Sequence, residues 1–379
     1  MRRGTERIMT GRTDRSDADD ERAIVVGGGY AGVTAANRLA RHGARPLLVT
    51  ARPHFVERIR LHRVASADRP HARVPFDALL RPDVELLVAT VARVDAADRR
   101  IVLDSGAERP FGALVLAVGS GARTVSSGVH CVDDESHAER LAGALRDRPD
   151  AVVTVVGPGA TGVELACALA DSGRRVRLAR AARLAADHHG RALAARLTSL
   201  GVALLDDDVP PVAAAGDLVV DATGLAIPAL AHDSGLPVDD RGRVVVDRSL
   251  RVHGVERVYA AGDAILVDGP GTAHLRPACA SAIPLGTAVA DVIARGRPRD
   301  AVPGYAARCL DLGDGHGRVQ FVSRTDRLLP FAVGGRLGGI GKEAICRFTL
   351  RWMRAGAPSP LPSWPTSRTG ALARTTAGA

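Results

Sequence analysis

The sequence of 379 residues predicts an α/β fold built from two dinucleotide-binding units and a small α+β C-terminal domain. The first unit is indicated by a glycine-rich turn between the apolar strand Ala23–Val26 and an alanine-rich helix over roughly Ala31–His42. The same strand, turn and helix arrangement recurs from Val152–Val156, about 130 residues further on. A third observation is the late strand Val258–Ala261, which ends in Gly262-Asp263. Together these features indicate two Rossmann-like units, one inserted into the other.

Both turns read GxGxxG, and each glycine of the pattern has its own role. In the first turn Gly27 permits the sharp reversal, Gly29 lets the backbone approach a pyrophosphate, and Gly32 lets the helix pack on the strand. The helix that follows directs free N–H groups and a partial positive charge at the phosphates. The same three roles fall, in order, on Gly157, Gly159 and Gly162.

The remaining elements follow from hydrophobic periodicity and from glycine, proline and aspartate punctuation. Within the first unit we expect a strand at Pro46–Val49 and an antiparallel meander of Val84–Val94 and Arg100–Leu103, with a return to the parallel sheet at Leu114–Val118. The second unit continues with a helix at Arg191–Leu200, strands at Val202–Leu205 and Leu218–Ala222, and a further meander at Val244–Val246. Later we expect a helix after Pro284, hairpin strands at Ala307–Leu312 and Arg318–Ser323, and a helix over Leu337–Arg354.

This order of elements predicts that one nucleotide-binding domain is nested inside the other. We assign residues 23–120 and 251–300 to the first domain, 121–250 to the second, and 301–355 to the C-terminal α+β domain. Residues 1–22 are polar and charged, and residues 356–379 are rich in Pro, Ser, Thr and Gly. These two ends are therefore expected to be a disordered arm and a flexible tail.

Composition limits the class of protein. The net charge is +9, but no nucleic-acid-binding motif or aromatic platform accompanies it, so no nucleic-acid partner is expected. The 51 basic residues include a single lysine, Lys342. The five cysteines lack CxxC spacing, which argues against a zinc site, any other metal site and a dithiol redox centre. Because no secretory signal and no bilayer-spanning apolar run is visible, a cytoplasmic protein is expected.

Neither unit has the acidic residue that usually binds ribose hydroxyls at the end of the second strand. In the first unit Thr50 stands near that position and can make only an uncharged hydrogen bond. In the second unit Arg180 stands there; it would suit the 2′-phosphate of NADPH or is simply solvated. Gly119 and Gly224 each close a strand, where they either let the chain pass close to a cofactor or only form a turn.

The segments Gly27–Gly32, Gly157–Glu164 and Tyr259–Asp263, taken together, resemble the two-dinucleotide flavoprotein superfamily of pyridine-nucleotide oxidoreductases. Within it, the resemblance is closest to the type II NADH:quinone oxidoreductase and apoptosis-inducing-factor-like branch, and it covers about residues 23–350. It implies FAD on the first unit and NAD(P)H on the second. Further cofactor contacts are expected from Tyr30, Ala31, Arg58, Thr161, Gly262, Ala282 and Pro284.

The resemblance also gives two acidic residues a role. It implies that Asp263 contacts the FAD ribityl chain and that Glu164 lies near the nicotinamide–flavin contact, where it orients the cofactor or relays protons. The residues alone leave alternatives open. Asp263 could be a helix N-cap, and Glu164 could match the helix dipole in the first turn of its helix.

The donor half of the reaction is better defined by the motifs than the acceptor half. The stretch Arg52–Asp77 has no cysteine, so the redox pair of a disulfide reductase is missing. Type II enzymes carry an AQxAxQxG segment beside the flavin, and the corresponding stretch here is Cys279–Gly286. It keeps Ala282 and Gly286 but has Ala280 and Pro284 in place of the two glutamines.

A quinone or similar small acceptor is the first hypothesis. Three alternatives stay open: a pathway-specific, secondary-metabolite flavin oxidoreductase or monooxygenase, a ferredoxin reductase-like enzyme, and a non-catalytic nucleotide-sensing protein. His62 could donate a proton to the acceptor or be a surface histidine. The helix Leu337–Arg354 is basic and amphipathic, which favours either packing on its own domain or peripheral contact with the inner face of a membrane. A homodimer also remains open.

Overall fold

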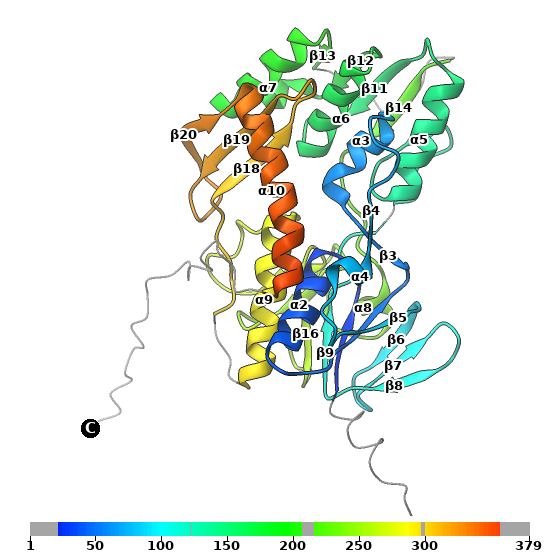
Figure 1. Ribbon diagram of the computed structural model, residues 1–379, viewed down its shortest axis with the longest axis vertical. Helices are drawn as coiled ribbons and strands as arrows, with labels where there is room; N and C mark the ends of the chain where they lie inside the picture. The colour runs from blue at the N-terminus through cyan, green and yellow to red at the C-terminus, as the bar shows by residue number, and fades with distance from the viewer. Residues whose placement is uncertain (1–21, 122, 207–215, 297–299, 357–379) are drawn as a thin grey trace, which may run out of the picture.

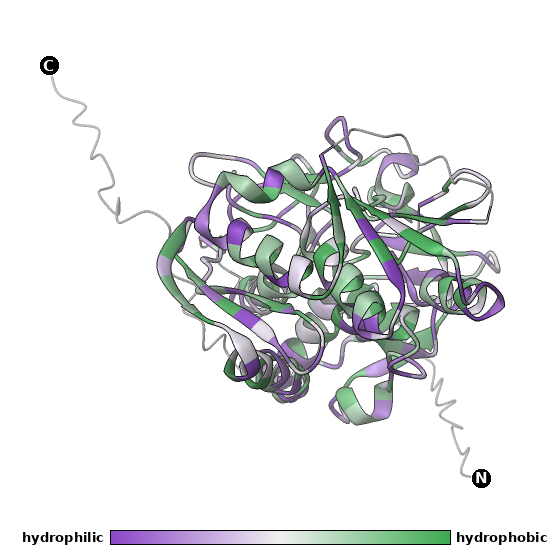
Figure 2. Ribbon diagram, turned by 90° about the horizontal axis from the view of Figure 1, so that it is seen from above, coloured by the Kyte–Doolittle hydropathy of each residue, from purple (hydrophilic) through white to green (hydrophobic). Residues whose placement is uncertain are grey.

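The computed structural model describes residues 22–121, 123–206, 216–296 and 300–356 (Figure 1). The expected N-terminal arm and C-terminal tail lie almost entirely outside the described residues. The fold is α/β, as predicted, and contains two five-stranded parallel sheets. Strands are largely hydrophobic, while many helices mix hydrophobic and hydrophilic residues (Figure 2). No helix among the described residues is long and apolar enough to cross a bilayer.

The first sheet confirms the nested chain order. Its strands lie in the order β16-β9-β1-β2-β5, and all neighbours pair in parallel. The strand β16 joins this sheet beside β9 although the whole second sheet intervenes in the sequence. The five strands are β1 (Ala23–Val26), β2 (Leu47–Thr50), β5 (Glu85–Val88), β9 (Ala113–Leu116) and β16 (Val258–Ala260). The exact domain boundaries remain predictions.

Two helices of the first unit cross at very close range. A Cβ added at Gly286 in α9 (Cys279–Arg295) would lie 2.3 Å from the carbonyl oxygen of Ala31 in α2 (Tyr30–Arg41). Only glycine permits that approach. The expected start of α9 after Pro284 is wrong, because the helix begins five residues earlier and contains the proline. Pro284 lies in its second turn.

The second sheet has the order β10-β14-β11-β12-β13, again all parallel. Its strands are β10 (Val129–His130), β11 (Val152–Val156), β12 (Arg175–Ala179), β13 (Ala203–Leu205) and β14 (Leu218–Asp221). The associated helices are α5 (Glu135–Asp147), α6 (Ala160–Asp171), η2 (Ala181–Ala186) and α7 (His188–Ser199).

Smaller elements connect the two sheets. The expected meander of Val84–Val94 and Arg100–Leu103 is present in part, as β6 (Val91–Asp95), β7 (Arg100–Leu103) and β8 (Glu108–Pro110). The first half of Val84–Val94 instead forms β5 of the parallel sheet. The strand β15 (Val244–Val246) does not form a simple meander, because it pairs in parallel with β17 (Ile265–Val267). The others are β3 (His54–Val56), η1 (Arg58–Arg60), α3 (Leu61–Ala65), β4 (Arg73–Pro75), α4 (Phe76–Leu79) and α8 (Leu230–Asp233).

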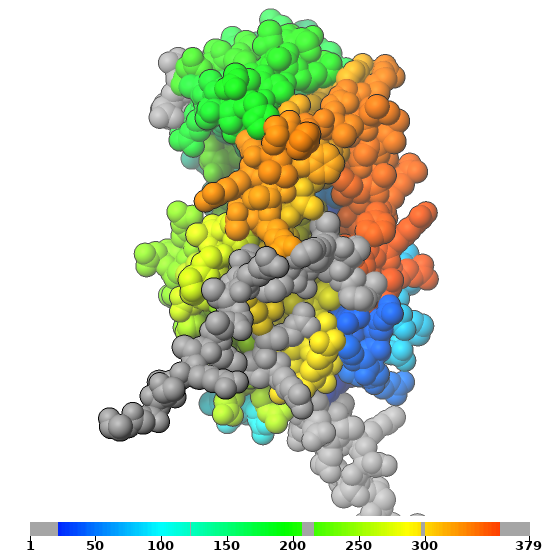
Figure 3. Space-filling view, turned by 90° about the vertical axis from the view of Figure 1, so that its left-hand side faces the viewer, coloured from blue at the N-terminus to red at the C-terminus, as the bar shows by residue number. Residues whose placement is uncertain are grey.

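The C-terminal segment links the two nucleotide units. The predicted hairpin is present as β18 (Ala307–Asp311) and β19 (Gly317–Val322), and β20 (Leu328–Val333) adds a third antiparallel strand. Helix α10 (Gly335–Ala355) lies along these strands and continues down to α2 and α4 (Figure 1). In the space-filling view, the β18–β20 segment lies directly below the second unit, with α10 beside it (Figure 3).

Candidate active site

Both glycine turns are open at the position where a phosphate would approach. A Cβ added at Gly29 or at Gly159 would meet no atom within 4 Å. These glycines are the N-caps of α2 and α6, and neither helix start has a side-chain cap. The first-turn N–H groups of each helix are therefore available to an anion. This arrangement fits a dinucleotide pyrophosphate at each turn.

The flanking glycines have the conformations that the motif requires. Gly27 and Gly157 have positive φ angles of 112° and 109°. A Cβ at Gly32 would lie 1.8 Å from the carbonyl oxygen of Gly27, and one at Gly162 would lie 1.9 Å from that of Gly157. Both helices therefore start directly against the preceding strand.

A half-buried carboxylate, that of Asp263, lies beside the start of α9. Asp263 accepts hydrogen bonds from the Ser120 hydroxyl at 3.3 Å and from the Ala278 amide at 3.2 Å. Burial raises the pKa of Asp263, although the nearby charge of Arg58 and these two hydrogen bonds favour the carboxylate. Arg58 in turn donates to Ser120 at 2.7 Å. Because Ala278 is the residue that caps α9, Asp263 is not itself the N-cap.

The other predicted cofactor residues lie at the ends of strands or on the two crossing helices. Thr50 is the last residue of β2, and Arg180 follows β12 with a left-handed backbone. Tyr30 and Ala31 are buried in α2, whereas Thr161 is exposed in the first turn of α6. The remaining residues are Gly119 after β9, Gly224 after β14, Gly262 after β16, and Ala282 and Pro284 buried in α9.

Glu164 is held in a buried network rather than by the helix dipole. It is the fifth residue of α6, so the expected position in the first turn is wrong. Its Oε1 atom accepts two hydrogen bonds, one from Lys342 Nζ at 3.0 Å and one from the backbone amide of Asp311 at 2.9 Å. Burial lowers the pKa of Lys342, but the charge and hydrogen bond of Glu164 outweigh it and raise that pKa. Lys342 therefore stays protonated.

The same network reaches His62, the second residue expected to be catalytic. His62 is only 5% exposed, which excludes the surface histidine interpretation. Its Nε2 lies 3.3 Å from the carboxylate of Asp311, which also pairs with Arg63. Burial raises the pKa of Asp311, but His62 and Arg63 outweigh that effect and the net shift is downward. His62 and Glu164 thus meet through one residue of β18.

Lys342 and Asp311 are the members of this network that sequence reasoning missed. In the sequence Lys342 is the single lysine of the chain and one of the charges of the basic amphipathic helix. The structure places it on the buried side of α10, where it is 7% exposed. A lone lysine on the inner face of an amphipathic helix requires a buried acidic partner. That requirement was the available signal.

One cluster of potential metal ligands also escaped the sequence analysis. Ligand atoms of Cys131, Asp133 and His137 lie within 4.8 Å of one another. The carboxylate of Asp133 already accepts hydrogen bonds from Arg123 at 2.9 Å and 3.2 Å. Burial raises the pKa of the Cys131 thiol to about 11, which disfavours the thiolate that a metal needs.

Two open glycine turns on nested parallel sheets define an oxidoreductase fold that binds two dinucleotides. The chain belongs to the pyridine nucleotide-disulphide oxidoreductase family, whose model matches residues 21–282. The cofactors of this family are FAD and NAD(P)H, as the family resemblance implied.

Relatives support the same placement. An NADH dehydrogenase-like protein of Mycobacterium tuberculosis (strain H37Rv) is 31% identical over 294 residues, covering 64% of this chain and 72% of that protein. Type II NADH:quinone oxidoreductase Ndh of the same organism is 27% identical over 319 residues, covering 67% and 69%. The predicted superfamily is therefore confirmed, and the chain is similar to a member of the predicted type II branch.

Solved structures share the fold. The sulfide:quinone oxidoreductase of Aquifex aeolicus superposes with a TM-score of 0.73 at 16% identity, covering 90% of this chain and 93% of that one. NDH2 from Plasmodium falciparum, solved with NADH, gives 0.73 at 14% identity, covering 88% and 97%. At these identities the likeness extends to the fold alone.

Proposed function

We propose that this flavoprotein oxidoreductase passes electrons from NAD(P)H to a quinone or similar small acceptor. The observation that carries the proposal is the network in which Glu164, Lys342, Asp311 and His62 meet. It joins elements of the second unit, the first unit and the C-terminal segment, as a site between donor and acceptor requires. The similarity to a type II NADH:quinone oxidoreductase supports the same acceptor class.

When bound, FAD would supply the chemistry of hydride acceptance and electron transfer. The residues of the chain would bind the nucleotides and supply the proton. Gly29 and Gly159 would let the two pyrophosphates approach, and Asp263 would hold the FAD ribityl chain through a hydrogen bond. Glu164 holds Lys342 in its protonated form, and the Asp311 carboxylate orients the His62 ring. His62 then donates a proton to the reduced acceptor as a general acid.

The test is an anaerobic two-stage reaction. The purified protein is mixed with NADH or NADPH while bleaching of its flavin band is followed, and menadione is added after reduction. Rapid recovery of the band with menadione is expected. Recovery only with a small iron–sulfur protein or with oxygen would contradict the quinone proposal and favour the ferredoxin reductase or oxidase alternative. A flavin band that neither nicotinamide bleaches would favour the nucleotide-sensing alternative.

A Glu164→Gln variant sharpens this test. It keeps the hydrogen-bond acceptor for the Asp311 amide but removes the charge that holds Lys342 protonated. We expect slower turnover with menadione and unchanged flavin content. Glu256→Gln is the matched control, because Glu256 is exposed.

We further propose that the outer face of α10 makes peripheral contact with a membrane. Leu337, Ile340 and Phe348 are 71%, 66% and 52% exposed and recur at helical spacing on one face. Phe331 of the adjacent β20 is 69% exposed. Apolar side chains flanked by arginines are typical of helices that lie on anionic lipid surfaces. The test compares the binding of the wild type and of a Leu337→Ser/Ile340→Ser variant to anionic vesicles. Equal binding of the two proteins would contradict this contact.

A further inference from the structure

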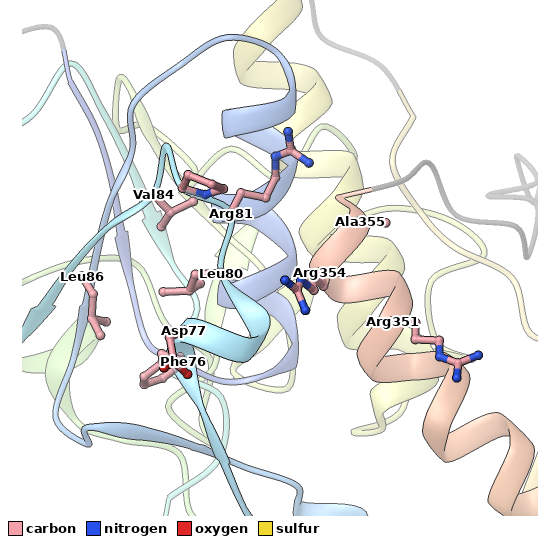
Figure 4. Close-up of a pocket in the computed structure, with 10 residues that line it drawn as sticks. Phe76, Asp77, Leu80, Arg81, Val84, Leu86, Arg351, Arg354 and Ala355 are labelled. Carbon is pink, nitrogen blue, oxygen red and sulfur yellow. The ribbon is translucent and has the colours of Figure 1, made fainter.

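A pocket of about 720 Å³ lies where the C-terminal end of α10 meets the segment from α4 to β5. That volume is within the range of small-ligand sites. Leu80, Val84 and Leu86 contribute apolar walls from the α4–β5 side. The opposite wall comes from α10 and carries Arg354 and Ala355 (Figure 4).

The pocket is strongly basic. Arg81, Arg351 and Arg354 line it together with a single acidic residue, Asp77. Within the part of the chain that the structure describes, no carboxylate lies within salt-bridge distance of these three arginines. The Nε atom of Arg81 is buried and has no hydrogen-bond partner among the described residues. Because this Nε atom is not accessible from the pocket, the terminal nitrogens of the Arg81 guanidinium are the ones that would donate to an anion there.

A buried asparagine fixes the two walls to each other. Asn37 of α2 is 0% exposed and donates to the carbonyl oxygens of Leu79 in α4 and Met353 in α10, both at 2.8 Å. Its own side-chain oxygen accepts the backbone amide of Arg81 at 2.9 Å. The backbone positions of Arg81 and α10 are therefore set by one side chain. The pocket is preorganised rather than an accidental gap.

The position of the pocket identifies the kind of anion. Arg351 continues the helical spacing of Leu337, Ile340 and Phe348, so the pocket lies at the end of the exposed apolar face of α10. In the view of Figure 4, Arg354 points from α10 toward α2 and α4, whereas Arg351 points the other way. A phosphate that adjoins acyl chains, as in an anionic phospholipid, matches a basic pocket beside an apolar surface. Residues 357–379 follow α10 but contain two arginines and no acidic residue, so their side chains would add to the positive charge.

We propose that this pocket binds the phosphate of an anionic phospholipid headgroup, with Arg81 and Arg354 as its donors. The inference rests on the proposed membrane contact of α10. It is independent of which electron acceptor the enzyme uses. Two charged hydrogen bonds to one phosphate would fix the protein at the membrane surface in a single orientation.

The test uses the full-length holoprotein and dihexanoyl-phosphatidylglycerol below its micelle concentration, with titration calorimetry as the readout. Saturable 1:1 binding is expected, with much weaker binding of dihexanoyl-phosphatidylcholine. The variant Arg81→Gln/Arg354→Gln should weaken binding by about tenfold or more, because it removes charge-assisted hydrogen bonds. The control Arg146→Gln/Arg241→Gln makes the same change of charge at exposed arginines elsewhere and should bind normally.

Three results would overturn the proposal. The first is equal affinity for the two lipids, and the second is an equal loss of lipid affinity in the two double variants. The third is an affinity for inorganic phosphate as high as that for phosphatidylglycerol. Flotation with vesicles containing phosphatidylglycerol tests the membrane contact of α10 separately from lipid binding in the pocket. Short-chain lipid binding without flotation would disprove the membrane contact and leave the pocket established as a lipid-phosphate site.

Discussion

The two glycine turns have the same backbone conformation but different surroundings. In the first turn, a Cβ at Gly27 would lie 2.3 Å from a backbone oxygen, and one at Gly28 would lie 2.7 Å from the Phe76 ring. In the second turn, the nearest atom to a Cβ at Gly157 is 3.1 Å away. The first turn is therefore the more tightly enclosed.

The helices that follow the two turns also differ in burial, and the first is again the more enclosed. Every residue of α2 from Tyr30 to Ala40 is buried, whereas α6 begins with the exposed residues Ala160 and Thr161. An enclosed turn suits a cofactor that stays bound, and an open one suits a nucleotide that must enter and leave in each turnover. We infer that the same motif has been placed in two settings that match a resident FAD and an exchanging NAD(P)H.

The first prediction separates the two turns, and its expected effect is the largest. Gly29→Val and Gly159→Val add side chains into space that is open in both turns, so both variants should fold. Gly29→Val should purify without the yellow flavin band. Gly159→Val should keep the band but no longer bleach with NADH, as visible spectra would record. Gly143→Ala in α5 is the control. Loss of flavin from Gly159→Val would contradict the assignment of the turns.

Each unit is held by its own set of buried contacts. The first unit closes where α2 packs against α9, at the close contact of Gly286 with Ala31 and at a buried ion pair of Arg38 with Asp291. The second unit is joined to the C-terminal segment through buried polar contacts, chiefly the pair of Glu164 with Lys342. Removing one partner of such a buried ion pair leaves the charge of the other partner buried and uncompensated.

The second prediction tests that pair. Lys342→Met leaves the Glu164 carboxylate buried without its counter-charge, and should lower the free energy of unfolding by about 3–5 kcal/mol. The double variant Glu164→Gln/Lys342→Met should recover most of that loss, because no charge is left uncompensated. Urea unfolding followed by circular dichroism measures both. If the double variant were no more stable than Lys342→Met, the stabilisation by Lys342 would not come from its ion pair with Glu164.

This contrast also explains what the sequence could reveal. The glycine turns and their strands were predicted because each is encoded within about ten consecutive residues whose spacing has a local meaning. The contact between Glu164 and Lys342 joins residues 178 positions apart, and no local pattern records it. The role of Glu164 in catalysis therefore stays a prediction, and the sequence offered none for Lys342.

Two local errors have physical reasons. The strand β20 was missed because Pro330 stands within it, and a proline argues against a strand in a sequence. It is an edge strand, where the missing N–H costs nothing. The start of α9 was placed after Pro284 for a similar reason, although the early turns of a helix tolerate proline better than its interior does.

The third prediction concerns proton delivery, and its effect is confined to the acceptor half of the reaction. His62→Gln removes the imidazole that contacts Asp311. We expect the rate of flavin reoxidation by menadione to fall by about 10²- to 10⁴-fold, the usual contribution of a general acid. Stopped-flow measurement should show flavin reduction by NADH unchanged. An equal loss in both half-reactions would mean that His62 only supports the structure. His232→Gln is the control, because that side chain is 73% exposed.

The last prediction is the smallest and asks whether the polar contacts of the second unit respond to pH. His189 of α7 is buried, and its Nδ1 accepts a hydrogen bond from Arg318 of β19 at 3.1 Å. Burial, with the charge of Arg318, lowers its pKa from 6.5 to about 4. The folded state therefore favours the neutral ring. Its contribution to stability is complete above pH 6.5 and is lost as the pH falls toward 4.

His189→Gln should remove this dependence while keeping an oxygen acceptor for Arg318. Thermal unfolding midpoints are measured between pH 6.5 and 4 for the wild type and the variant. The wild type should lose more stability than His189→Gln over that interval, because only the wild type must protonate a buried ring. Parallel curves would mean that other groups cause acid unfolding. If the unfolding midpoint of the variant fell more steeply with pH than that of the wild type, the contact between α7 and β19 would favour the charged ring. Burial of His189 would then not be the cause of the pH sensitivity of the second unit.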